Sequence, residues 1–193
     1  MFSVLNIQAK QIFIGNMLFI ACCAFYLAWW LLAFKPSGAV TGMKTGWLLL
    51  PAVVFGIIGV VIVMRGLSAK TQTAHLFNNV YVLWGSLAAY FILLAITVLL
   101  LKRPATTELL LIVAWGMLAL LEINTMYGFG LFSHVRPIVF IVVICVAFVV
   151  SLVCYVLYYN LDMSAGYIDG MIPLLVSAIT LAAISGFMLF PSK

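Results

Sequence analysis

Six long apolar runs dominate this chain and limit the folds that are open to it. Each run has about 20 or more mostly apolar residues, the length that an α-helix needs to cross a lipid bilayer. Pro and Gly occur in several of the connections, where they end helices. The sequence therefore predicts six transmembrane helices at residues 12–34, 46–67, 78–101, 106–126, 137–159 and 168–190.

Composition supports the same class. Of the 193 residues, 67% are hydrophobic and only 7% are charged, whereas about 25% of the residues of a soluble domain are charged. A soluble fold of this size could not bury so much apolar surface. No linker or low-complexity stretch divides the chain. We expect an all-α, polytopic integral membrane protein, with residues 1–193 forming one compact six-helix domain.

The charged residues indicate the partners and the topology. Nine Lys/Arg against four Asp/Glu give a formal charge of +5, and the cations are scattered between the runs. Nucleic-acid binding needs a clustered basic face and is not expected. The cations suit helix ends that face the headgroups of a lipid bilayer. Six helices place both termini on the same side, and the slight excess of cations there favours a plasma-membrane protein with cytoplasmic termini.

Motifs of enzymes and metal sites are missing from the sequence. There is no HExxH, GxSxG or P-loop motif, and these are the patterns that carry hydrolytic or phosphate chemistry. The four cysteines lie in apolar runs without CxxC spacing, so a zinc or redox site has no support. No catalytic residue, metal or cofactor is predicted, and an enzyme is disfavoured although a membrane enzyme stays open.

Glu122 is the first candidate functional residue, because ionisable groups inside membrane spans are costly and usually functional. It follows the start of its run by sixteen residues, or about 24 Å of helix, which places it about one turn inside the terminal side. Asn16 and several titratable residues fall in the same layer: Arg65, His75, His134 and Arg136.

Two interpretations of this layer stay open. In the functional one, Glu122 pairs with Arg65 or Arg136 in a polar vestibule, and a histidine responds to pH. In the structural one, the arginines extend to lipid headgroups and Glu122 is a hydrogen-bonded or protonated residue of the bundle.

Polar stripes mark three of the expected helices. Their members include Asn79, Ser86, Tyr90 and Thr97 on the third, Ser151 and Tyr155 on the fifth, and Asp169 and Ser177 on the sixth. These spacings put each set on one helix face, which we expect to point inward. There the side chains line a solute path or bond to neighbouring helices. For Asp169, near a helix start, complementing the helix dipole is the preferred interpretation.

Small residues recur every four positions on two helices, at Ala52 and Gly56 and at Ala178, Ala182 and Gly186. Such faces let helix backbones approach closely inside a membrane. We expect them to pack helices within the chain, and a homo-oligomer is the alternative use.

In size and helix count the chain is similar to two families of six-helix solute conduits. One family carries acetate and related monocarboxylates, and the other passes urea and short amides. The likeness extends to the glycine and aromatic placement in AWGMLALLE (114–122) and AGYIDG (165–170). The Asn-Pro-x-Pro-type signature of the acetate family is absent. The resemblance implies a conduit fold and assigns no site residue.

Together these features favour a transporter or channel for a small polar solute or ion, with Glu122 supplying proton coupling or pH gating. Two alternatives remain. One is an integral membrane enzyme acting on a lipid or isoprenoid, and the other is a non-catalytic subunit of a membrane complex.

Overall fold

The computed structural model describes residues 5–35, 45–68, 75–104, 106–132 and 135–190, and these parts are helical with no strand among them. The main helices, in chain order, are α1 (Ile7–Ala33), α3 (Leu49–Leu67), α4 (Asn79–Ala95), α5 (Thr107–Gly128), α6 (Val135–Leu157), α7 (Met163–Asp169) and α8 (Ile172–Met188). A short 3-10 turn, η2 (Gly46–Leu48), directly precedes α3, and another, η4 (Tyr158–Asn160), directly follows α6. A π-helical segment, η3 (Ile96–Leu100), extends α4.

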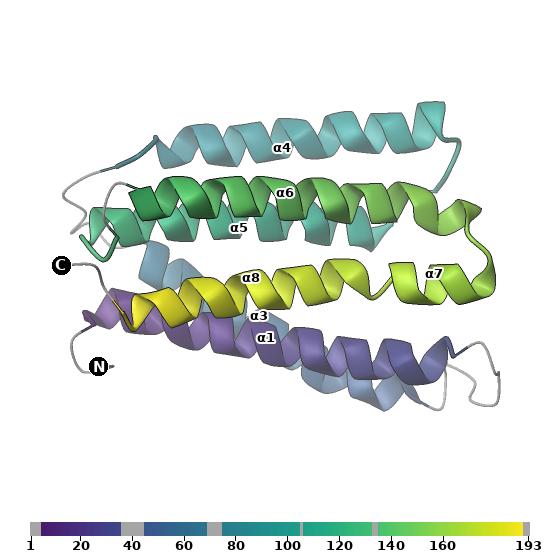
Figure 1. Cartoon of the computed structure of the whole chain (residues 1–193), viewed down its shortest axis with the longest axis horizontal. Coiled ribbons are helices and arrows are strands. Elements are labelled where there is room, and N and C mark those ends of the chain that lie inside the picture. Colours follow the sequence, from purple (N-terminus) through teal and green to yellow (C-terminus); the bar gives the residue numbers. More distant parts are fainter. Residues whose placement is uncertain (1–4, 36–44, 69–74, 105, 133–134, 191–193) are drawn as a thin grey trace.

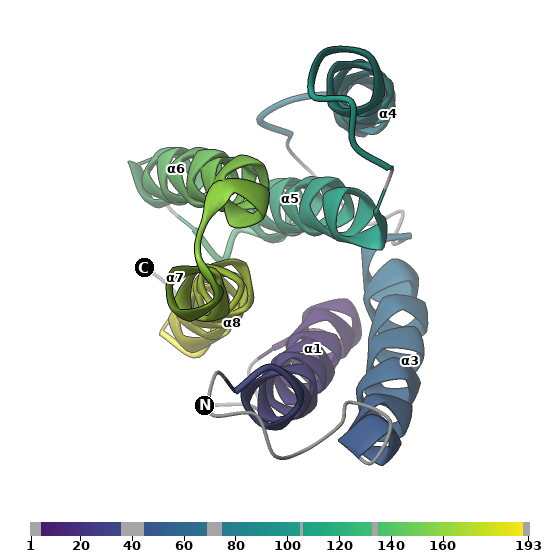
Figure 2. The same cartoon turned by 90° about the vertical axis from the view of Figure 1, so that its right-hand side faces the viewer.

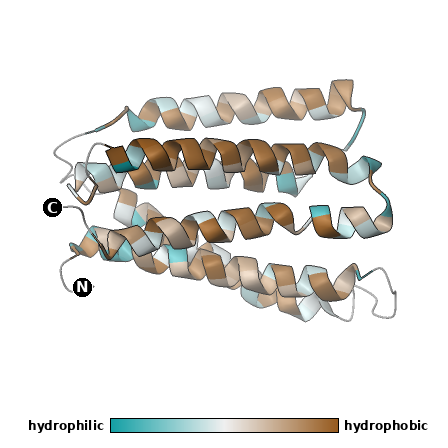
Figure 3. Ribbon diagram, in the orientation of Figure 1, coloured by the Kyte–Doolittle hydropathy of each residue, from teal (hydrophilic) through white to brown (hydrophobic). Residues whose placement is uncertain are grey.

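The prediction of six apolar helices is confirmed. Six helical segments are long and apolar enough to cross a membrane, and Figure 3 shows hydrophobic residues over most of their length, notably along α6. Two segments begin earlier than expected because polar side chains cap them. Asn6 accepts a hydrogen bond from Ala9 N at 2.7 Å, so α1 begins at Ile7. Asp162 likewise accepts from Ala165 N at 2.9 Å and starts α7, as expected for N-cap residues.

The helices run along one common direction (Figure 1). α1 begins and α8 ends at the same end of the bundle, called the terminal end below, and α7 lies at the far end. Viewed along the bundle, α5 is central, with α6 and α4 on one side and α1, α3 and α8 on the other (Figure 2). α8 packs against α1 and α6, while α4 is outermost and packs mainly on α5.

α1 and α3 form the closest helix pair of the bundle. A Cβ added at Gly66 would lie 2.7 Å from Ile12 Cγ1 and 2.9 Å from the Gln8 carbonyl oxygen. One added at Gly15 would meet Val63, and one at Gly59 would lie 3.1 Å from the Phe19 ring. Glycine is therefore needed at positions 15 and 66 for the two backbones to approach, whereas a Cβ at position 59 would require a small shift of the Phe19 ring.

The small-residue faces named above are used unequally. Ala52 is buried, and a Cβ at Gly56 would lie 3.4 Å from Cys22 Sγ on α1, so this face takes part in the α1–α3 contact. On α8, a Cβ at Gly186 would meet nothing within 4 Å and Ala182 is exposed. The α8 face is therefore not a close-packed contact within the described chain.

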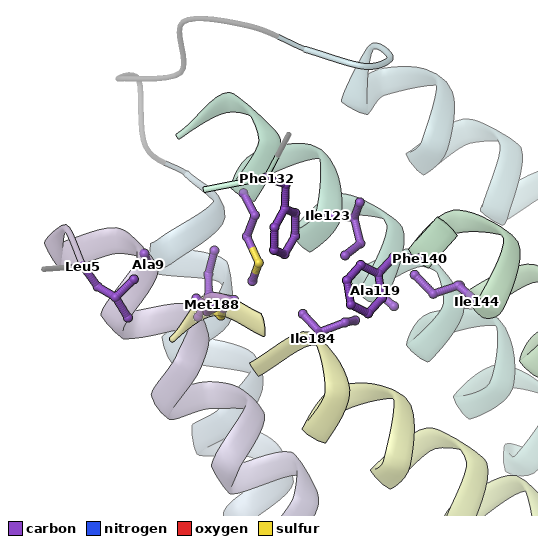
Figure 4. Packing of buried hydrophobic residues seen from close by; sticks show 11 residues of the cluster. Leu5, Ala9, Ala119, Ile123, Phe132, Phe140, Ile144, Ile184 and Met188 are labelled. Carbon is purple, nitrogen blue, oxygen red and sulfur yellow. The ribbon is translucent and has the colours of Figure 1, made fainter. Parts of the chain in front are cut away.

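The largest buried apolar cluster lies toward the terminal end and joins α1, α5, α6 and α8. In Figure 4, Ala119 of α5, Phe140 of α6 and Ile184 of α8 meet within it. A second, smaller cluster combines Leu109 and Ile112 of α5 with Tyr155 of α6. The first cluster surrounds the buried polar residues described next.

Candidate functional site

Glu122 lies on α5 and is completely buried, with 0% of its surface exposed. Asn16 of α1, which is also fully buried, donates a hydrogen bond from Nδ2 to Glu122 Oε2 at 2.8 Å. Glu122 is six residues from the end of α5 at Gly128, or about 9 Å at the α-helical rise. The carboxyl is therefore deeper in the bundle than one turn, because α5 extends beyond residue 126.

The structure joins Glu122 to Asn16 and not to an arginine. Arg65 is exposed at the end of α3. Arg136 donates from Nη1 to the Phe190 carbonyl at 2.9 Å, and its guanidinium lies 5.8 Å from the centre of the Phe187 ring. The expected Glu122–arginine pair is thus replaced by a neutral amide partner, since both arginines sit at the bundle end. His134 lies outside the described residues.

Two buried oxygen atoms of this pair lack partners. Neither Glu122 Oε1 nor Asn16 Oδ1 has a hydrogen bond. A carboxylate oxygen and an amide oxygen are both acceptors, and a protonated carboxyl supplies the donor that the two lack. An ionised carboxylate in the same place would need water or a cation, because a buried unpaired charge is very costly. The pair as it stands therefore suits a protonated carboxyl.

Asn124, also fully buried on α5, holds the segment that leads into α4. Its Oδ1 accepts from Leu76 N at 2.8 Å, and its Nδ2 donates to the Phe77 carbonyl at 2.8 Å and to Asn79 Oδ1 at 2.6 Å. Sequence reasoning placed Asn79 on a polar stripe and missed Asn124. The signal was available, because an amide inside an apolar run needs a partner just as Glu122 does.

Replacing Asn124 by leucine is expected to release the start of α4 from α5. Backbone groups of Leu76 and Phe77 would lose their partner, at a cost of about 1–3 kcal/mol. Hydrogen exchange at the Leu76 amide should accelerate strongly. Asn79→Ala is the control, because it removes one bond of Asn124 and leaves its hydrogen bonds to the backbone of Leu76 and Phe77. Unchanged exchange at Leu76 in Asn124→Leu would contradict this role.

The remaining residues of the predicted path are divided between different contacts. Tyr90 of α4 packs against the second cluster, which contains Tyr155 of α6, so the two tyrosines lie in the same region of the bundle. Ser86 is half-buried between Asn79 and Tyr90 on α4. His75 is exposed and lines a cavity of about 430 Å³ with Phe77, Asn78 and Asn79. This cavity adjoins the segment that Asn124 holds.

Asp169 occupies a break between α7 and α8 near the far end. It is the last residue of α7 and only 8% exposed, so it lies at a helix end and not in the first turn of a helix, where we expected it. Pro173, in the first turn of α8, has no N–H to donate to the Asp169 carbonyl, which accounts for the interruption. Asp169 Oδ2 has no hydrogen-bond partner.

The end of α1 holds this break in place. The Trp30 ring lies directly over Gly170, and its Nε1 donates to the Tyr167 carbonyl at 3.0 Å. In return, the Tyr167 hydroxyl donates to the Leu31 carbonyl at 3.2 Å. A side chain at residue 170 would displace the indole, so Gly170 is required for this contact.

Within the described ranges, no group of three or more His, Cys, Asp or Glu side chains could hold a metal ion. Comparisons of the chain with protein-family models, with curated proteins and with solved structures find no match. The likeness to the two conduit families therefore stays an expectation drawn from size and helix count.

Proposed function

We propose that this chain is an integral protein of the plasma membrane, with cytoplasmic termini, that moves a small polar solute or ion across the bilayer. Protonation of Glu122 is coupled to that movement. The observation that carries the proposal is the fully buried Glu122–Asn16 pair, which has no arginine, lysine or histidine partner among the described residues. Six helices of sufficient length and apolarity support the location.

A carboxyl at this position is costly for a protein that uses it only for packing. Ionisable residues within membrane spans commonly face the bundle interior and mark ion or proton pathways. Glu122 faces the interior, since it contacts α1 and shares its helix face with Ala119 and Met126 of the buried cluster. A proton taken up or released there changes the charge of the bundle interior by one unit.

The helices on either side of the pair belong to different parts of the bundle. α1 is packed closely on α3, whereas α5 packs on α6 and α4. α1 and α5 share little backbone contact, and the Asn16–Glu122 hydrogen bond joins them beside the apolar cluster to which both helices contribute. Loss of the carboxyl proton would leave a buried negative charge that the Asn16 amide does not neutralise. Water drawn to that charge would favour separation of α1 from α5, which is the kind of movement that alternating access requires.

The interrupted α7–α8 segment is a second supporting feature. Discontinuous helices form the substrate and ion sites of many transporters. Here the interruption carries Asp169, a buried carboxyl with one free oxygen. The bundle therefore holds a buried acid toward each of its two ends.

Flux into proteoliposomes tests this function. Purified protein should take up at least one of urea, acetate and tetramethylammonium faster than protein-free liposomes do, at a rate that depends on pH. Glu122→Gln keeps an amide or carbonyl group for Asn16 but cannot exchange a proton. It is expected to lose the pH dependence and to lower the rate about a hundredfold, the lower end of the usual range for a proton-transferring group.

The matched control is Asp162→Asn, which removes a carboxyl from an exposed N-cap and leaves a residue that also caps helices. Its flux should equal that of the unmodified protein. Unchanged, pH-dependent flux in Glu122→Gln would remove Glu122 from the mechanism, and the absence of any flux above protein-free liposomes would reject transport of these solutes.

α4 favours a second candidate role, as a subunit of a membrane complex. No residue of α4 is buried, and its large side chains Tyr81, Trp84 and Phe91 are exposed. A photo-crosslinking residue at position 84 should then capture a partner polypeptide in native membranes. Crosslinks to lipid alone would argue against this role.

A further inference from the structure

The cavity at the start of α4 is lined by polar side chains that play no part in the Glu122–Asn16 pair. It has a volume of about 430 Å³ and is lined by His75, Phe77, Asn78 and Asn79, and small-molecule sites usually have about 300–1,000 Å³. Asn124 of α5 fixes one side of it, because its Nδ2 donates to Asn79 Oδ1 at 2.6 Å and to the Phe77 carbonyl at 2.8 Å. A fully buried residue therefore holds the cavity wall in place.

The side chains of this cavity offer hydrogen-bond donors. Asn79 Oδ1 accepts from Asn124, and Asn78 Oδ1 accepts from Val80 N at 2.9 Å, so the oxygen of each amide is engaged. Neither Nδ2 group has an acceptor among the described residues. Each Nδ2 carries two donor hydrogens, and the imidazole of His75 carries at least one. The cavity therefore suits a ligand that is rich in acceptor oxygens.

Backbone amides at the start of α4 are already bonded. Val80 N donates to Asn78 Oδ1, and Tyr81 N donates to the Asn78 carbonyl at 3.0 Å. Before the helix, Leu76 N donates to Asn124 Oδ1 at 2.8 Å. Recognition of a ligand in this cavity is therefore left to the side chains and does not depend on free helix amides.

The charge distribution determines the sign of that ligand. All four acidic residues of the chain belong to its described part, where one is fully buried and three lie toward the far end: Glu122, and Glu108, Asp162 and Asp169. Arg65, by contrast, is exposed at the end of α3. Leu67 from that helix end and Leu76 beside His75 pack against the same buried cluster. An anion at the cavity therefore meets an arginine in the same region and no exposed acidic side chain.

The position of the cavity along the bundle selects the kind of anion. The apolar segment that begins at Asn79 continues to Leu100 and has 22 residues, or about 33 Å, close to the hydrocarbon thickness of about 30 Å. Its first residue therefore lies at the level of the lipid headgroups, at the terminal end of the bundle (Figure 1). Phospholipid phosphates are concentrated at this level, and Phe77 in the cavity wall offers an apolar contact to the glycerol part of a lipid.

We propose that the cavity lined by His75, Asn78 and Asn79 binds the phosphate group of an anionic phospholipid. Arg65 adds to the positive potential at that end of the bundle. Pockets between membrane helices hold phosphate headgroups in the same way elsewhere. A bound lipid secures the start of α4, a helix that has no buried residue of its own. This inference goes beyond the proposed function and does not rest on transport.

Titration calorimetry of the protein in neutral detergent micelles tests the site. The probe is dihexanoylphosphatidylglycerol, a short-chain anionic phospholipid, and it should bind more tightly than dihexanoylphosphatidylcholine, whose headgroup has no net charge. Inorganic phosphate should bind at least tenfold more weakly than the anionic phospholipid, because it has no glycerol or acyl part to contact Phe77.

Two variants change the donors of the cavity and keep the local fold. Asn79→Asp retains an acceptor for Asn124 Nδ2 but puts a negative charge in the cavity, so it should weaken binding at least tenfold. Asn78→Ser keeps a residue that caps α4 and removes the two amide donors, and it should weaken binding about tenfold.

Arg65→Gln and Lys35→Gln form a matched pair, because each removes one exposed positive charge, from the terminal end and from the far end respectively. Arg65→Gln should weaken binding about fivefold, as expected for a cation near a headgroup. Lys35→Gln should change the dissociation constant less than about twofold.

Three results would overturn the proposal. They are equal binding of the two phospholipids, undiminished binding by Asn79→Asp, and binding of inorganic phosphate as tight as that of the anionic phospholipid. The last would assign the cavity to a free anion. Because Asn78 is exposed, Asn78→Ser provides the test if Asn79→Asp does not fold.

Discussion

Replacing Gly66 by valine is expected to lower the free energy of unfolding by about 3 kcal/mol, the upper part of the usual range for overpacking a close contact. The first added carbon would lie 2.7 Å from Ile12 Cγ1 and 2.9 Å from the backbone oxygen of Gln8. A side chain can rotate away from such a contact, but a helix backbone must move as a whole. The closest helix pair of the bundle would therefore separate along this face.

Reversible unfolding in mixed SDS micelles measures the effect. Gly85→Val is the matched control, because a Cβ at Gly85 in α4 meets nothing within 4 Å. The control introduces the same β-branched residue into a helix, so it accounts for helix propensity, and its effect should be below about 1 kcal/mol. Equal stabilities of the two variants would show that α1 and α3 do not depend on this close approach.

Asn16→Leu is expected to destabilise the protein by about 1–3 kcal/mol, because it leaves the buried Glu122 carboxyl without a partner. The double variant Asn16→Leu/Glu122→Leu should regain much of this stability. Replacing both members of a buried polar pair by apolar residues removes the unsatisfied group as well as the bond. The coupling energy between the two positions should therefore be large, on the order of 1–3 kcal/mol.

The same unfolding assay measures the stability of all four proteins in this double-mutant cycle: the unmodified protein, the two single variants and the double variant. Arg65→Leu combined with Glu122→Leu is the control cycle, since Arg65 is exposed at the end of α3 and should show coupling near zero. Additive effects of the Asn16 and Glu122 substitutions would contradict a direct bond between them. Strong coupling to Arg65 would restore the ion pair that the sequence alone suggested.

The helices and the polar layer show how far sequence reasoning reached. The hydropathy and the length of an apolar run are properties of consecutive residues. They were therefore sufficient to locate six apolar helices and to single out Glu122. Asn16 was placed in the same layer, and two interpretations stayed open: Glu122 paired with an arginine, or Glu122 as a hydrogen-bonded or protonated residue of the bundle. The structure has the amide instead, because Arg136 is held by the Phe190 carbonyl and Arg65 stays at the surface.

Asp169 shows a different limit. Its position near the expected start of a helix suggested a dipole-complementing role, but the Asp162 cap moves the helix start to Met163 and Pro173 interrupts the segment after Asp169. The result is a carboxyl at a helix end inside the bundle.

By itself, the sequence determined the helical class of this protein, the number of apolar helices and the presence of one ionisable residue well inside an apolar run, since each depends on the local order of residues. Only the tertiary structure decided that Glu122 meets Asn16 and that Asn124 holds the entry to α4. Those contacts join residues 45 or more positions apart. These contacts depend on which helix faces meet. Every helix face is apolar enough to face lipid, so the sequence of one helix does not indicate which other helix it packs against.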